Sequence, residues 1–244
     1  MSVPRQRAST VSDFGSRVAS FLTSLRFDVP LPGGFAVLDP YRDGAVVDVV
    51  QQFCTRYYTG NHLRLPIWGI NPGRFGAGVT GLSFTDPYAL RHDLGLVTSI
   101  DGRREPSADY VYRVIGAYGG PTAFYHDVYM SALSPLGFIK DGVNINFYDD
   151  PTLMRDIVPF VVDCMRRQTA MGLRDDVCIV LGSGKLKVFM ERYIRPVIPY
   201  ATIHYLEHPR FIMQYRRTTM RDYVDRYVGV VRNSVEQSVI RSGA

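Results

Sequence analysis

The chain has 244 residues, of which 46% are hydrophobic and 21% are charged, and its formal net charge is +5. This length suffices for one large domain with a buried core, and no apolar run approaches the length that a membrane span requires. Only Lys140, Lys185 and Lys187 among the 28 basic residues are lysines. An arginine-rich chain suits phosphate-bearing partners, although genomic base composition alone can produce the same bias.

The cysteines point to a reducing environment. Cys54, Cys164 and Cys178 are far apart in sequence and form no CxxC pair, which argues against a zinc ribbon, an iron-sulfur cluster and a disulfide-stapled secreted fold. The first residues are basic and serine-rich but lack the apolar stretch of a signal peptide. We therefore expect an intracellular protein with a flexible tail at residues 1–9 and a single domain at residues 10–244.

The predicted elements alternate between strand and helix after an initial helical region. Helices are expected near residues 10–25 and 41–58, separated by the proline- and glycine-rich loop 28–35. Short apolar strands follow at 65–70, 129–133, 177–181 and 201–206, and further helices at 108–118, 151–171, 184–194 and 219–239. This alternation predicts an α/β fold with three α/β/α layers, in which helices cover both faces of a mostly parallel sheet of about four strands.

Ligands of such sheets bind at the carboxyl ends of the strands. The loops after the first, second and fourth predicted strands read NPGRFGAG (71–78), SPLGF (134–138) and EHPRF (207–211). We expect these three loops to converge on one site.

Three familiar binding patterns fail on spacing. The glycine-rich stretch 69–84 lacks the GxGxxG of dinucleotide-binding folds, and LGSGKLK at 181–187 lacks the full phosphate-binding signature, so it is expected to turn a strand into a helix. His204 and His208 are four apart, which along a strand separates them by about 13 Å. No metal site and no cofactor are predicted.

The stretch GINPGRFGAGVTGLSF (69–84) resembles motif one of the uracil-DNA glycosylase superfamily, particularly its single-strand-selective monofunctional (SMUG) branch. The positions in register are Asn71, Pro72, Gly73, Phe75, Gly76, Thr80, Gly81 and Phe84. HPRF at 208–211 is similar to motif two of the same branch, and GINPGRFGAG, FTDP and HPRFIMQYR are most similar to a bacterial SMUG-like subfamily. The resemblance spans roughly residues 60–225. It implies a uracil-DNA glycosylase-like fold and a monofunctional DNA glycosylase that leaves an abasic site.

The resemblance also implies roles for individual residues. Asn71 would hold the attacking water, His208 would donate a hydrogen bond to a carbonyl oxygen of the leaving base, and Phe84 would stack on the extruded base. Other predicted substrate-binding residues are Gly69, Ile70, Pro72, Gly73, Phe75, Gly76, Ser131, Ala132 and Ser134. Predicted DNA-binding or wedge residues are Pro209, Arg210, Phe211, Arg216 and Arg217, within a segment that has four arginines and no acidic residue.

The sequence departs from the SMUG pattern at Ala132, where that branch carries an asparagine that reads the uracil edge. We hypothesise that a small residue there relaxes specificity and admits xanthine or hypoxanthine. The expected partner is DNA, single- or double-stranded and containing a deaminated base, with no membrane and with the protein as a monomer. Two alternatives stay open: a damaged-DNA-binding module with weak or no catalysis, and an unrelated nucleotide-processing enzyme.

Overall fold

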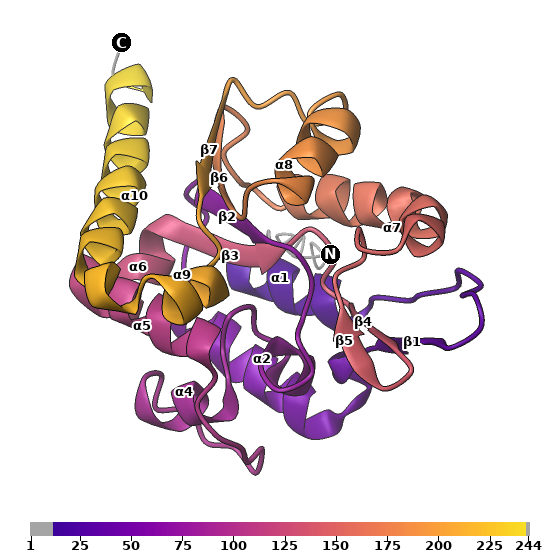
Figure 1. Ribbon diagram of the computed structural model, residues 1–244. Coiled ribbons are helices and arrows are strands. Elements are labelled where there is room, and N and C mark those ends of the chain that lie inside the picture. Colours follow the sequence, from indigo (N-terminus) through magenta and orange to yellow (C-terminus); the bar gives the residue numbers. More distant parts are fainter. Residues whose placement is uncertain (1–11, 243–244) are drawn as a thin grey trace, which may run out of the picture.

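The computed structural model describes residues 12–242 (Figure 1), so the predicted tail at 1–9 lies outside the described residues. Aspartates start the first two long helices: Asp13 caps α1 (Phe14–Thr23) by accepting from the Ser16 amide, and Asp43 caps α2 (Gly44–Tyr57) by accepting from the Ala45 amide. A short 3₁₀ helix, η1 (Pro40–Arg42), precedes α2. Both predicted helices are therefore present, with shorter bounds than expected.

The central sheet has four parallel strands in the order β3-β2-β6-β7. Their bounds are Leu65–Gly69 for β2, Val128–Ala132 for β3, Val177–Leu181 for β6 and Thr202–Leu206 for β7. Gly69 pairs with Ala132, so β2 and β3 end side by side, and Leu181 pairs with Leu206, so β6 and β7 also end side by side. The predicted α/β fold with a parallel, four-stranded sheet is confirmed.

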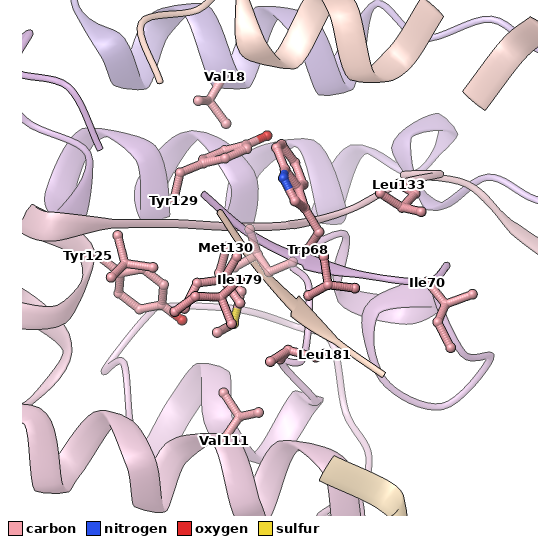
Figure 2. Packing of buried hydrophobic residues seen from close by; sticks show 14 of the residues in the cluster. Val18, Trp68, Ile70, Val111, Tyr125, Tyr129, Met130, Leu133, Ile179 and Leu181 are labelled. Carbon is pink, nitrogen blue, oxygen red and sulfur yellow. The ribbon is translucent and has the colours of Figure 1, made fainter. Parts of the chain in front are cut away.

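Helices cover both faces of this sheet. Figure 2 shows Val18 of α1 next to Trp68 and Tyr129 on one face, and Val111 facing Ile179 on the other. On the first face lie α1, α2 and α7 (Pro151–Thr169); on the second lie α5 (Pro106–Tyr118), α6 (Pro121–Asp127) and α10 (Met220–Ser242). After β6 the chain turns into α8 (Lys185–Phe189) and the π-helix η2 (Met190–Ile194), which together make up the single helix expected there.

A second, smaller sheet was not predicted. It is antiparallel, in the order β1-β4-β5, and consists of β1 (Phe35–Leu38), β4 (Gly137–Lys140) and β5 (Val143–Ile145). Strands of three or four residues have too few positions to show an alternating pattern, and β1 pairs with residues about one hundred positions away. This sheet brings the segment that follows β5 to the carboxyl end of β2.

Several short helices were also missed by the sequence analysis. They are α3 (Ala77–Thr80), α4 (Pro87–His92), α6, α9 (Pro209–Tyr215) and the 3₁₀ helix η3 (Arg217–Thr219). Among residues 12–242, no helix combines the length and the apolar character needed to cross a membrane.

Candidate active site

The loops at the carboxyl ends of the parallel strands surround an open groove of about 1200 Å³. Segments after β2, β6 and β7 line it, together with Ala132 at the end of β3. Of the three loops singled out in the sequence, 71–78 and 207–211 contribute residues to the groove, whereas no residue of 134–138 lines it. A volume of this size exceeds that of one base and leaves room for the adjoining nucleotides. The predicted residues that line the groove are Gly69, Ile70, Asn71, Pro72, Gly73, Phe75, Phe84, Ala132, His208, Arg210, Phe211 and Arg216.

Asn71 is held by hydrogen bonds to the backbone at the end of β5 and just after it. Its Nδ2 donates to the carbonyl oxygens of Ile145 (3.2 Å) and Pro72 (3.3 Å), and its Oδ1 accepts from the Phe147 amide at 3.2 Å. An amide oxygen has two lone pairs, so one remains for a water molecule. An aspartate at this position would place a carboxylate against the Ile145 carbonyl, and the contact therefore favours an amide.

His208 is the N-cap of α9, and this position determines its tautomer. Its Nδ1 accepts a hydrogen bond from the Arg210 amide at 3.1 Å, so in the neutral ring the proton is on Nε2. Burial, followed by the positive charge of Arg210, lowers the pKa of His208 from 6.5 to about 4. At neutral pH the side chain is therefore an uncharged imidazole with one N–H donor left for a ligand.

Phe84 is in a strained backbone conformation next to the end of β2. Its φ of 54° lies in the left-handed region, which is uncommon for a bulky residue and is concentrated at functional sites. A Cβ on Gly69 would lie 2.7 Å from the Phe84 ring, so only glycine leaves space for this ring position. The ring centroids of Phe84 and His208 are 5.9 Å apart. The aromatic face and the imidazole donor therefore lie beside each other.

Gln168 of α7 forms hydrogen bonds with residues at the end of β3. The Gln168 Oε1 accepts from the hydroxyls of Tyr129 (2.9 Å) and Ser131 (2.6 Å), and its Nε2 donates to the Ala132 carbonyl at 3.2 Å. The Ser134 hydroxyl donates to the Leu136 carbonyl at 2.7 Å. Ala132 lines the groove, whereas Ser131 and Ser134 are buried and bonded elsewhere, so the structure does not bring these two predicted residues to the groove.

Three other predicted residues do not line the groove either. Gly76 is buried next to the Glu105 carboxyl, Pro209 is buried at the first position of α9, and Arg217 is exposed in η3. Pro209 starts the helix that His208 caps, which is a typical position for proline.

Aromatic and arginine side chains rim the groove. Phe75 is 53% exposed with the Arg74 guanidinium 4.6 Å from its ring centroid, and Phe211 is 39% exposed with Arg216 at 5.3 Å. The Phe211 and Tyr215 rings are 5.3 Å apart. Exposed aromatic faces beside guanidinium groups are suited to bases and phosphates of a nucleic acid.

Two groove segments were missed by the sequence analysis. The segment 103–107 (RREPS) runs into the first residues of α5 and contributes two arginines and Glu105. The segment 143–148 contributes Asn144, Asn146 and Tyr148. Neither segment matches a known motif. The signals that could have identified them as part of the site are the two adjacent arginines in 103–107 and the two asparagines in 143–148. No group of three histidine, cysteine, aspartate or glutamate side chains in residues 12–242 is arranged to hold a metal ion.

Comparisons with known proteins agree with this geometry. A model of the uracil DNA glycosylase superfamily matches residues 56–232. The chain belongs to this superfamily, and it is a DNA glycosylase, a hydrolase that acts on N-glycosyl bonds. Among solved structures it is similar to wild-type SMUG2 of Pedobacter heparinus, with 34% sequence identity and a TM-score of 0.88 over 91% of this chain and 98% of that chain. This similarity supports the SMUG-like branch of the superfamily. A search of curated proteins found no match.

Proposed function

We propose that this protein is a monofunctional glycosylase that excises uracil and deaminated purines from DNA. The observation that carries the proposal is the arrangement of Asn71, Phe84 and His208 in one groove, with the amide and the imidazole each oriented by a backbone hydrogen bond. Family membership supports a glycosylase over the two alternatives, a binding module and an unrelated nucleotide-processing enzyme.

The chemistry requires a placed water and a donor for the departing base. Cleavage of an N-glycosidic bond develops positive charge on the sugar and negative charge on the base. The free lone pair of Asn71 Oδ1 holds water for attack at the anomeric carbon, and the Nε2–H of neutral His208 donates to a base carbonyl oxygen as that oxygen becomes anionic. An asparagine does not take up a proton near pH 7, so Asn71 positions the water and the proton leaves to solvent.

The size of the base pocket supports the inclusion of purines. Ala132, at the end of β3, has no amide to read the uracil edge, and Gly73 has no side chain to narrow the pocket. A pocket built from small residues excludes larger bases poorly, so we propose that hypoxanthine and xanthine enter beside uracil.

The lysines support a monofunctional reaction. Lys140 is paired with Asp150 at 3.0 Å, Lys185 is paired with Asp149 at 3.1 Å, and Lys187 lies over the ring of Tyr205. None of these amines lines the groove. With no lysine amine in the groove to form a Schiff base, we expect the product to be an uncut abasic site.

The test is a panel of single- and double-stranded oligonucleotides that contain uracil, hypoxanthine, xanthine or only normal bases. We expect strand breaks at the deaminated bases after alkali and none without it. Equal cleavage at undamaged purines would contradict the proposed specificity, and breaks without alkali would contradict the monofunctional reaction. No cleavage of any deaminated base would favour a binding module.

A further inference from the structure

Glu105 is a groove residue to which the mechanism above gives no part. It precedes α5, and its half-buried carboxyl lies against the loop after β2: Oε1 is 3.9 Å from the place of a Cβ on Gly73, and a Cβ on Gly76 would collide with Oε2. The structure gives this carboxyl no hydrogen bond and no ion pair within residues 12–242. Two glycines thus make room for a carboxyl group that has no protein partner.

The neighbouring carboxylate, Asp86, has hydrogen-bond donors around it, unlike Glu105. It is fully buried at the N-cap of α4, where it accepts from the Ala89 amide at 2.7 Å and from the Glu105 amide, with Arg104 Nη1 at 3.8 Å. Burial raises the pKa of Glu105, the charge of Asp86 raises it further, and Arg210 opposes both. When two carboxyl groups have such different surroundings, the one without donors is the one that can carry a proton at a useful pH.

The other charged and titratable groups of the groove come from the segments after β2, β5 and β7, from the segment before α5, and from α9 and α10. They are Arg74, Arg103, Arg104, Tyr148, Glu207, His208, Arg210, Tyr215, Arg216 and Tyr223. Of these groups, only Arg210 is among the causes that shift the pKa of Glu105, and His208, with a pKa of about 4, is neutral at neutral pH. Glu105 is therefore a groove carboxyl whose protonated form is favoured by burial and by the charge of Asp86.

Purines and pyrimidines differ in how they leave a sugar. A purine has a basic lone pair at N7, and protonation there lets the base depart as a neutral molecule. Uracil has no such atom and leaves as an anion, for which the His208 donor suffices. A carboxylic acid beside the base is useful to the first reaction and not to the second.

We propose that Glu105 is a catalytic acid for purine substrates, which protonates N7 of flipped hypoxanthine or xanthine. The proposal rests on the proposed function of the groove. The proton moves from the Glu105 carboxyl to N7, the N9–C1′ bond breaks with its electron pair going to the base, and water adds to C1′. The water's proton restores the Glu105 acid directly or through solvent, so no further reactant is needed.

The experiment compares wild-type protein with Glu105→Gln, which keeps the shape of the side chain but has no acidic proton. Single-turnover release is measured for hypoxanthine, for uracil and for 7-deazahypoxanthine, in which a C–H replaces N7. We expect Glu105→Gln to release hypoxanthine about 100-fold more slowly, and uracil and 7-deazahypoxanthine within threefold of wild type. Glu236→Gln, an exposed change on α10 outside the groove, is the matched control and should alter none of the rates.

The pH dependence gives a second readout. Wild-type release of hypoxanthine should fall as pH rises from 5.5 to 8, because the acid must be protonated, and Glu105→Gln should lose this slope. An equal loss on uracil and hypoxanthine, or an equal loss on 7-deazahypoxanthine, would refute a role as acid, as would wild-type protein that releases uracil but no purine. Wild-type protein that releases neither uracil nor a deaminated purine would instead refute the proposed function, and this role with it.

Discussion

The protonation state of His208 gives the sharpest prediction for catalysis. With a pKa of about 4, roughly one ring in a thousand is charged at pH 7. The hydrogen bond from the Arg210 amide to Nδ1 leaves Nε2–H as the remaining donor. A neutral donor contributes equally at every pH above about 5.5, so uracil release should be independent of pH from there to 8.

The variant that isolates this donor is His208→Asn. Asparagine is a favourable N-cap and can replace Nδ1 as the acceptor for the Arg210 amide, but it has no group at the place of Nε2. Loss of one donor to a developing oxyanion typically costs about 3–4 kcal/mol, or about 10²–10³-fold in rate. His208→Ala should show the same rate loss and, in addition, a loss of stability of about 1 kcal/mol from the missing cap.

The assay is single-turnover release of uracil from an oligonucleotide at several pH values, with thermal unfolding of each variant as the control for folding. If a charged imidazolium were required, the wild-type rate would fall about tenfold per pH unit between 5.5 and 8, because the pKa lies below this range. Such a slope, or a His208→Asn rate within threefold of wild type, would refute the role of neutral His208.

Three further predictions concern the walls and the rim of the groove. Phe84→Ala should weaken transition-state binding by about 1–3 kcal/mol through lost stacking, seen as a lower kcat/KM, and an unchanged kcat/KM would exclude stacking by this ring. Gly69→Ala, whose methyl group would lie 2.7 Å from that ring, should lower the free energy of unfolding by about 1–3 kcal/mol and slow uracil release about 100-fold; a normal rate would show that the ring position does not matter. Replacing both Arg103 and Arg210 with alanine should reduce the number of counterions released on DNA binding by up to two, measured from the slope of log K against log salt concentration. A slope equal to that of the wild type would show that these two arginines do not contact phosphates.

The sheet could be predicted because each of its strands is a short apolar run that ends at a local signal. Gly69 follows the run of β2, Gly182 follows β6, and His-Pro soon follows β7. The antiparallel sheet could not be predicted, because Phe35 pairs with Lys140, which is far away in the sequence, and no local pattern encodes such a pairing. Tertiary contacts alone define these short strands.

The candidate site was predictable to the extent that it lies in contiguous motifs. Asn71, Phe84 and His208 are in two such motifs. In contrast, Glu105 reaches the groove, and the backbone of Ile145 and Phe147 reaches Asn71, only through folding. The N-cap role of His208 did have a signal, because proline in the next position is typical of a helix start. The directions of side chains had no such signal in the sequence. For this reason Ser131 and Ser134 were predicted to line the pocket, although their hydroxyls donate to Gln168 and to the Leu136 carbonyl instead.

The most direct test of the account is the rate of uracil release by Asn71→Ala under single-turnover conditions, measured beside wild-type protein. Alanine removes the oxygen that holds the water and the bonds to Ile145 and Phe147, so unfolding is followed in parallel to show that the variant is folded at the assay temperature. We expect a rate at least about 100-fold lower with DNA binding retained. A folded Asn71→Ala variant that releases uracil within threefold of the wild-type rate would contradict it.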